Sequence, residues 1–169
     1  PQAILSVDTF YAAVAKAAVE AGADIVNDVS GGEEDPAMFS TVAALQVPYI
    51  LMHSQGPADT MQQNPMYKNV SLDIATWFAQ KTEILRDAGI KDVILDPGFG
   101  FGKTLAHNYA LMNSLDLFKI FEVPLLVGIS RKSMIQKVLG VTATEALNGT
   151  SALHMVALQK GAAILRVHD

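Results

Sequence analysis

Residues 86–104 read RDAGIKDVILDPGFGFGKT and contain one full step of a pattern that recurs along the chain. A helical run ends just before Gly89, which is placed as a helix C-cap, and the apolar strand Val93-Ile94-Leu95 follows. Asp96 stands where that strand ends, and three glycines at alternate positions come after it. Glycines let a backbone adopt conformations closed to other residues and approach a ligand closely. The segment therefore predicts a strand that leads into a ligand-binding loop.

The loop ends in Gly102-Lys103-Thr104, as a nucleotide-binding P-loop does, but the spacing excludes that motif. A P-loop has a glycine five positions before its Gly-Lys pair, and here that position is Pro97, which has no N–H for a phosphate. A GxGxxG dinucleotide signature also fails, because Lys103 stands where its third glycine is required. We therefore expect no nucleotide at this loop, and Lys103 is the residue of the loop least expected to bind a ligand.

The same alternation of short apolar runs and longer amphipathic stretches extends over the whole chain. The predicted strands are Ala3–Val7, Ile25–Val26, Tyr49–Met52, Val93–Leu95, Leu125–Val127 and Ala163–Val167. The predicted helices are Ala12–Ala21, Pro36–Leu45, Leu72–Ala88, Asn108–Phe118, Lys132–Leu139 and Glu145–Lys160. Gly22 and Gly161 resemble Gly89 in standing just past a helix. Repeated βα units predict an α/β fold with a parallel sheet.

Regular alternation favours a TIM (β/α)₈ barrel over an open sheet. A complete barrel needs about 250 residues, whereas the 169 residues of this chain supply about six βα units. We therefore expect an incomplete barrel that forms a single domain over residues 1–169.

The composition narrows the class of protein. Half of the residues are hydrophobic and 17% are charged, which excludes a disordered chain. The net charge of −5 argues against a nucleic-acid partner, and no apolar run is long enough to span a membrane. The chain contains no cysteine, which removes disulfides and thiolate metal sites. We expect a cytoplasmic protein that binds small molecules rather than nucleic acid or membranes.

Each predicted strand ends in polar side chains, whereas the junctions from helix to strand are short and show no comparable pattern, for example Ala21-Gly22-Ala23. These strand-end residues are Asp8, Asn27, Asp28, His53, Asp96, Ser130, Arg131, Lys132, Arg166 and His168. Ligands of parallel α/β folds bind at the carboxyl ends of the strands. The pattern therefore predicts one common site at that edge.

Several of these residues have structural alternatives. Asp8 precedes a helix and could be its N-cap, and Asn27 with Asp28 could stabilise a turn. Asp96 is harder to explain structurally, because a buried carboxylate without partners is costly. His53, alone at a strand end, is more typical of a hydrogen-bonded structural residue.

Two other groups of side chains indicate binding of an anion. Residues 130–133, Ser-Arg-Lys-Ser, open a predicted helix, where N–H groups and cations favour an anion or a carbonyl oxygen. Arg166 and His168 alternate across Val167 and so share one face of a strand. His107 and His154 have no companions at metal-ligand spacing, so no zinc site is predicted. Trp77 lies in an amphipathic helix and is expected in a core or an interface.

Five segments of the chain, taken in order, resemble those of the dihydropteroate synthase family of folate biosynthesis. They are Ser6-Val7-Asp8-Thr9, Asn27-Asp28-Val29-Ser30-Gly31-Gly32, residues 96–104, Ser130-Arg131-Lys132-Ser133 and Arg166-Val167-His168-Asp169. Leu51-Met52-His53 with Thr60-Met61-Gln62 is similar to a further region of that family. The resemblance implies a TIM barrel that joins 6-hydroxymethyl-7,8-dihydropterin diphosphate to 4-aminobenzoate, giving 7,8-dihydropteroate and pyrophosphate through a cation-like, SN1-type step.

The resemblance also implies roles for particular residues. The pterin site would comprise Asp8, Asn27, Val29, Met52, Asp96, Phe101 and Lys132. Arg166 and His168 would bind the diphosphate, and Phe101, Lys132 and Ser133 would bind aminobenzoate. Asp8, Asp96 and Lys132 would be the catalytic residues. A homodimer that binds sulfonamide inhibitors is implied as well.

The resemblance further implies that the first two βα units and the last helix of the family are absent here. A loop of the absent part would contact Mg²⁺, so no metal ligand is expected in this chain, and the isolated chain is expected to be catalytically crippled. Two alternatives remain open, namely a corrinoid-linked pterin methyltransferase and a non-catalytic pterin-binding fragment.

Overall fold

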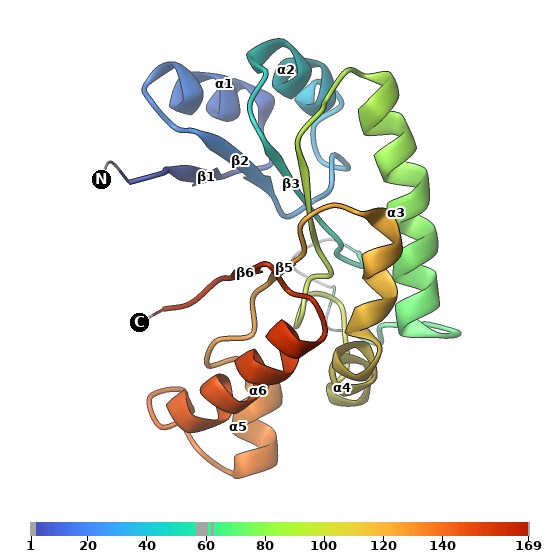
Figure 1. The fold of residues 1–169 in the computed structure, drawn as a ribbon, viewed down its shortest axis with the longest axis vertical. Helices are drawn as coiled ribbons and strands as arrows, with labels where there is room; N and C mark the ends of the chain where they lie inside the picture. The colour runs from blue at the N-terminus through green and yellow to red at the C-terminus, as the bar shows by residue number, and fades with distance from the viewer. Residues whose placement is uncertain (1–2, 57–60, 62, 169) are drawn as a thin grey trace. The chain divides into compact units, whose positions relative to one another are not determined.

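The computed structural model describes residues 3–56, 61 and 63–168, so that Thr60, Gln62 and Asp169 of the quoted segments lie outside the described residues. All six predicted strands are confirmed (Figure 1). The strands are β1 (Ser6–Asp8), β2 (Ile25–Asp28), β3 (Tyr49–Met52), β4 (Val93–Asp96), β5 (Leu126–Val127) and β6 (Ile164–Leu165). The helices are α1 (Ala12–Glu20), α2 (Met38–Leu45), α3 (Val70–Asp87), α4 (Leu105–Asn113), the 3₁₀ helix η1 (Leu115–Phe121), α5 (Ser133–Leu139) and α6 (Leu147–Gln159).

The helices follow the predicted amphipathic stretches with one difference. The stretch expected as a single helix over Asn108–Phe118 is α4 followed by η1, and α4 begins three residues earlier, at Leu105. Thr104 causes the earlier start, because its side chain caps the helix by accepting a hydrogen bond from the N–H of His107 (3.1 Å).

The chain divides into two compact units. The first comprises Pro1–His53 and Thr76–Asp96, and the second comprises Ser54–Ala75 and Pro97–Asp169.

In the first unit, β1 to β4 form a parallel sheet in the order β1-β2-β3-β4. Helix α1 packs against β1, β2 and α2. All four residues of β3 are buried, which explains why its sequence is continuously apolar. The ladder from β3 to β4 continues one step beyond the strands, where the N–H of His53 donates to the carbonyl of Asp96 (2.9 Å). All four strands thus end at the same edge of the sheet.

In the second unit, β5 and β6 are parallel and pair Leu126 with Ile164 and Val127 with Leu165. Helix α4 packs against η1 and α5, and α5 packs against α6. The buried core of this unit includes Phe99, Leu111, Leu115, Phe118, Val127, Ile129 and Met134.

The predicted helix C-caps are confirmed at Gly22, Gly89 and Gly161. All three have positive φ, and in each the glycine N–H donates to a carbonyl three residues back. The next residue then donates to a carbonyl five residues before it, as Ala23 does to Ala18 (2.9 Å). This arrangement is the Schellman motif, which ends a helix and turns the chain at once into the next strand.

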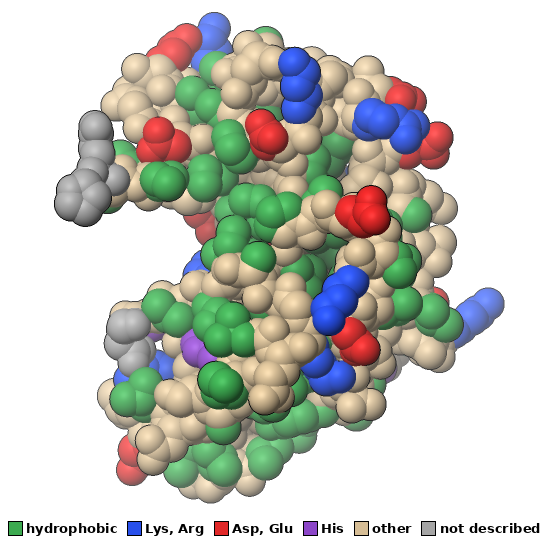
Figure 2. Space-filling model, in the orientation of Figure 1, with side chains coloured by type: hydrophobic (Ala, Val, Ile, Leu, Met, Phe, Trp, Pro, Cys, Tyr) green, Lys and Arg blue, Asp and Glu red, His purple; other side chains and the backbone are tan. Residues whose placement is uncertain are grey.

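Acidic and basic side chains are interspersed on the face shown in Figure 2. None of the helices in the described part of the chain is both long and apolar enough to cross a membrane.

Candidate active site

The strand register of the first unit gathers four of the predicted site residues on one face of the sheet. Asp8 pairs with Asn27 across β1 and β2, and Met52 pairs with Asp96 across β3 and β4. Asn27 also pairs with Ile50, which in turn pairs with Ile94. Because side chains alternate between faces along a strand, Asp8, Asn27, Met52 and Asp96 face the same side, at the carboxyl ends of the strands.

Within this group, the hydrogen bonding of the Asn27 side chain gives the strongest argument for a ligand contact. Its side chain is 4% exposed, and its carbonyl oxygen Oδ1 is buried with no hydrogen-bond partner among the described residues. A buried amide oxygen without a partner costs free energy. A ligand N–H donor at this position would remove that cost. The structure therefore favours the binding interpretation of Asn27 over the turn interpretation.

Asp28, the next residue, does stabilise a turn. It is fully buried, and its carboxylate accepts hydrogen bonds from the N–H and hydroxyl of Ser30 (2.8 and 2.7 Å) and from the N–H of Gly32 (2.9 Å). The Tyr49 hydroxyl also donates to it (2.7 Å). Burial, and then the nearby Asp28 charge, raise the pKa of Tyr49, so its hydroxyl stays a donor. Asp28 therefore anchors the loop that carries Val29, which is half-buried.

Asp8 is exposed and does not cap the following helix. Helix α1 starts after Tyr11, whose N–H donates to the Thr9 hydroxyl (3.1 Å). The Asp35 carboxylate accepts from the N–H of Ala12 (2.8 Å), the first residue of α1. The N-cap alternative for Asp8 is therefore wrong, and Asp8 remains available to a ligand.

Three further residues of the first unit are buried to different degrees. Met52 is fully buried, and His53 is 6% exposed. The rings of His53 and Trp77 meet edge to face with centroids 5.1 Å apart. Trp77 is half-buried and lies against Gly31, so closely that a Cβ on that glycine would come within 2.6 Å of the indole. Trp77 thus packs within the unit and supports the loop after β2.

In the second unit, the glycine-rich loop has the backbone that its sequence predicts. Gly98, Gly100 and Gly102 have φ of 67°, 83° and 60°, a region that side chains rarely allow. A Cβ on Gly102 would also lie 2.5 Å from the carbonyl oxygen of Gln55. The loop therefore needs glycine both for its backbone conformation and for close packing.

Lys103 and Asn108 hold this loop in place. Lys103 is 4% exposed, and its ammonium donates to the carbonyls of Gly98 (2.9 Å) and Phe101 (3.0 Å). The Asn108 side chain accepts from the N–H of Gly100 (2.8 Å) and donates to the carbonyls of Lys103 (3.3 Å) and Thr104 (2.7 Å). The sequence interpretation missed Asn108. The available signal was an amide residue in the first turn of a helix that directly follows a glycine-rich loop.

The structure brings Lys132 and Phe101 together. The Lys132 ammonium donates to the carbonyl of Phe99 and lies 4.6 Å from the centroid of the Phe101 ring. Lys132 is the N-cap residue of α5, and Ser133, the first residue of that helix, is exposed. Arg131 is structural, because its guanidinium donates to the carbonyls of Ala143 (2.9 Å) and Thr144 (2.6 Å).

Arg166 and His168 follow β6, which ends at Leu165, so their shared strand face stays a prediction. The Arg166 guanidinium covers Gly128 so closely that a Cβ on that glycine would lie 2.7 Å from its terminal nitrogen. His168 is exposed, and its Nδ1 is 3.0 Å from the Ser130 hydroxyl. That contact leaves Nε2 as the ring atom for a ligand. Gly128 was missed from the sequence, where it appears only as an interruption of an apolar run.

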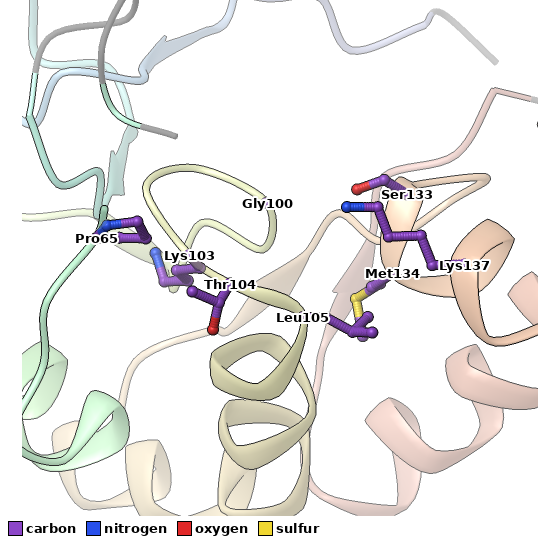
Figure 3. A pocket seen from close by; sticks show the side chains of 8 residues that line it. All are labelled: Pro65, Gly100, Lys103, Thr104, Leu105, Ser133, Met134 and Lys137. Carbon is purple, nitrogen blue, oxygen red and sulfur yellow. The ribbon is translucent and has the colours of Figure 1, made fainter. Parts of the chain in front are cut away.

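A pocket of about 560 Å³ opens beside the glycine-rich loop that follows β4 (Figure 3). Its lining residues all belong to the second unit: Pro65, Gly100, Lys103, Thr104, Leu105, Ser133, Met134 and Lys137. It includes one predicted aminobenzoate residue, Ser133, and a neighbour of another, Gly100 beside Phe101.

Across residues 3–56, 61 and 63–168, no three His, Cys, Asp or Glu side chains are grouped so that they could hold a metal ion. His107 instead takes part in the cap of α4, where its Nδ1 accepts from the N–H of Thr104 (3.3 Å).

Parallel βα units with polar side chains at the strand ends define the fold class as α/β, of the TIM-barrel type. A family model described as pterin binding enzyme matches residues 2–168, and the chain belongs to that family. The dihydropteroate synthase of Haemophilus influenzae is 42% identical over 167 residues, which are 98% of this chain and 60% of the relative. This chain thus spans about 60% of the length of that curated relative.

Solved structures agree with this assignment. The dihydropteroate synthase of Yersinia pestis, solved with a sulfonamide drug, superposes on the whole chain with a TM-score of 0.96 and 43% identity, and 62% of its own chain is covered. The enzyme of Thermus thermophilus, solved in complex with 6HMPPP, has a TM-score of 0.94 and 38% identity over 98% of this chain and 66% of its own. The predicted fold class, an incomplete TIM barrel, is confirmed.

Proposed function

We propose that this chain carries substrate-binding residues of a dihydropteroate synthase, which condenses 6-hydroxymethyl-7,8-dihydropterin diphosphate with 4-aminobenzoate. The observation that carries the proposal is the row of Asp8, Asn27, Met52 and Asp96 on one face of the sheet, with the Asn27 amide oxygen buried and unpaired. A pterin ring presents adjacent N–H donors and acceptors on one edge, and carboxylate and amide side chains match them. The similarity to synthases supports the same assignment.

Within this proposal, the flat pterin is bound between apolar and polar side chains. Asp96 accepts from adjacent N–H groups of the ring, and Asn27 pairs with a further donor. Lys132 donates to a ring acceptor, while Val29, Met52 and Phe101 contact the ring faces. Phe101, Lys132 and Ser133 bind aminobenzoate next to it.

The proposed reaction breaks the bond between the pterin CH₂ carbon and the diphosphate oxygen, and pyrophosphate leaves with the bonding electrons. Arg166 and His168 stabilise the negative charge that grows on the leaving group. The carboxylates of Asp8 and Asp96 favour the cation left on the pterin side. The aminobenzoate nitrogen then forms the new C–N bond and loses a proton.

Other parts of the proposal rest on the resemblance. They are a single pterin-binding domain over residues 1–169, a cytoplasmic location, a homodimer, sulfonamide inhibitors and a Mg²⁺ ion. The described residues contain no group of three His, Cys, Asp or Glu side chains that could hold a metal ion. No step of the proposed reaction is assigned to Mg²⁺.

Calorimetry with the full-length protein tests the proposal. The pterin diphosphate should bind, and 4-aminobenzoate should bind to that complex and release pyrophosphate. Binding of a methylated folate instead would favour a pterin methyltransferase, and pterin binding with no response to aminobenzoate would favour a non-catalytic module.

The variant Asn27→Leu sharpens this test. Leu has a similar shape and removes an unpaired polar atom, so the free energy of unfolding should be unchanged or higher. Affinity for the pterin should fall by about 10- to 100-fold, because the lost hydrogen bonds lie in a buried site. Asn148→Leu, at an exposed position of α6, is the matched control. Equal pterin affinity in Asn27→Leu and wild type would contradict the assignment of Asn27.

A further inference from the structure

Three lysines surround the glycine-rich loop and the pocket, and their ammonium groups differ in what they contact. The Lys103 ammonium is buried and donates to the carbonyls of Gly98 and Phe101. The Lys132 ammonium donates to the carbonyl of Phe99 and lies against the Phe101 ring. Two of the three cations are therefore engaged by the loop itself.

Lys137 is the third lysine, and it lines the pocket from α5. Its side chain is exposed. Lys137 follows Ser133 by four residues, so the two side chains are neighbours on one face of the helix. In Figure 3 the Lys137 ammonium and the Ser133 hydroxyl lie on the same side of the pocket, and both point toward the loop at Gly100.

The lining of the pocket has a consistent charge. Its two ionisable side chains are Lys103 and Lys137, both cationic, and Ser133 and Thr104 add hydroxyl groups. A volume of about 560 Å³ is within the range of small-molecule sites, and the lining of the pocket runs along α5 from Ser133 to Lys137. An anionic group placed at that end would meet an exposed ammonium and a hydroxyl donor.

We propose that Lys137 determines the specificity for the second substrate, because its ammonium and the Ser133 hydroxyl bind the anionic group at the end of the arylamine opposite its reacting nitrogen. This inference rests on the proposed function and adds to it a residue that recognises the negative charge of the amine substrate. The alternative for Lys137 is a structural one, since a cation in the last turn of a helix interacts favourably with the helix dipole. If Lys137 had only that structural role, its substitution would change the affinities for charged and neutral ligands by the same factor.

The test compares two ligands of nearly the same shape, 4-aminobenzoate and neutral 4-aminobenzamide. Their affinities are measured by calorimetry for the full-length protein saturated with a pterin that lacks the diphosphate leaving group, so that no turnover follows, or, if that pterin does not bind, for the free protein. In Lys137→Gln, affinity for 4-aminobenzoate should fall by about 2- to 5-fold, as expected for a solvent-accessible ion pair, with 4-aminobenzamide unchanged. Lys137→Glu should lower 4-aminobenzoate binding further. Lys91→Gln, at an exposed position of the first unit, is the matched control.

Retained binding of the neutral amide shows that each variant is folded. An unchanged ratio of the two affinities in Lys137→Gln would overturn the inference, and so would equal weakening of both ligands, which would indicate packing rather than charge recognition. The proposed function fails separately, if wild-type protein does not bind the pterin diphosphate or release pyrophosphate from it. The ratio of the two amine affinities reports on Lys137 in either case.

Discussion

Asn27 and Asp28 are adjacent residues of β2 whose side chains face opposite sides of the sheet. Asn27 shares its face with Asp8 and Asp96, whereas Asp28 bonds to Tyr49 and to the loop after β2. Both are polar, both are buried and both end the same strand, so composition does not distinguish them. The alternation of side chains along a strand places Asn27 on the face of the proposed site and Asp28 on the opposite face, against the scaffold.

Asp35 is a second residue whose importance depends on its contacts. Its carboxylate accepts from the N–H of Ala12 in α1 (2.8 Å) and from the N–H of Ala37 at the start of α2 (2.9 Å), and these bonds, the first being the larger cause, lower its pKa. A carboxyl whose pKa is lower in the folded state stabilises the protein above its unfolded pKa of about 3.9. That stabilisation disappears as the pH falls through the folded pKa.

We therefore predict that Asp35→Asn reduces the loss of stability that the protein shows as the pH falls into the acid range. The unfolding midpoint of the wild type should decline between about pH 5 and pH 2, and the variant should decline less over that range while being less stable at pH 7. Urea titrations monitored by circular dichroism give the midpoints. The matched control is an exposed carboxylate changed in the same way, Asp92→Asn.

Gly128 leaves room for the side chain of Arg166, which is a proposed diphosphate-binding residue. A methyl group there would lie 2.7 Å from the Arg166 guanidinium, which must then move. We predict that Gly128→Ala weakens binding of the pterin diphosphate by about 10-fold or more, the loss of one charge-assisted hydrogen bond. Gly22→Ala, whose Cβ would meet nothing within 4 Å, should cost stability through its φ of 111° but leave the affinity unchanged. Similar affinities for the two variants in a fluorescence titration would contradict this role.

At the scale of elements, the glycine-rich loop is shaped by α4 as much as by its own residues. Three hydrogen bonds from the Asn108 side chain tie the loop to the first turn of that helix. The Tyr67 hydroxyl adds a fourth bond, to the carbonyl of Gly102 (2.9 Å). Because glycines are conformationally permissive, these contacts select one loop conformation from the many that the sequence allows.

This arrangement predicts a large effect of Asn108→Ala. The N–H of Gly100 would lose its partner, so the free energy of unfolding should fall by about 1–3 kcal/mol. Affinity for 4-aminobenzoate should fall as well, because Phe101 lies on the released loop. The control is Asn113→Ala, an exposed position at the end of the same helix. An Asn108→Ala protein with wild-type stability in urea would show that the loop is held by its other contacts.

At the scale of the whole molecule, the residues of the proposed site are divided between the two compact units. Asp8, Asn27, Met52 and Asp96 belong to the first unit, and Phe101, Lys132, Ser133, Arg166 and His168 belong to the second. The chain spans about 60% of the length of its curated relative from Haemophilus influenzae. The active site of a TIM barrel is built from the ends of several βα units, so a part of the barrel is expected to be less active than the whole.

We accordingly predict that residues 1–169 alone turn over at no more than about 1% of the rate of the Haemophilus influenzae enzyme, the scale of effect expected when positioning groups are lost. Dihydropteroate formation from the pterin diphosphate and 4-aminobenzoate is the measurement. Circular dichroism and pterin binding of the same sample provide the control for folding. Turnover close to that of the relative would contradict the prediction.

The local features of this protein were readable from its sequence because they depend on near neighbours along the chain. Apolar runs and C-cap glycines gave the six strands and three of the helix ends. Helix α4 was misplaced by three residues, because its start depends on a side-chain cap at Thr104 that an apolar pattern does not reveal.

Residue roles that depend on contacts between distant segments required the tertiary structure. The sequence could not separate Asn27 from Asp28, assign the capping of α1 to Asp35, or show that Lys103 is held by carbonyls while Lys137 faces a pocket. The physical reason is that periodicity acts over a few residues, whereas burial and hydrogen bonding of a polar group are decided by whichever part of the chain folds against it.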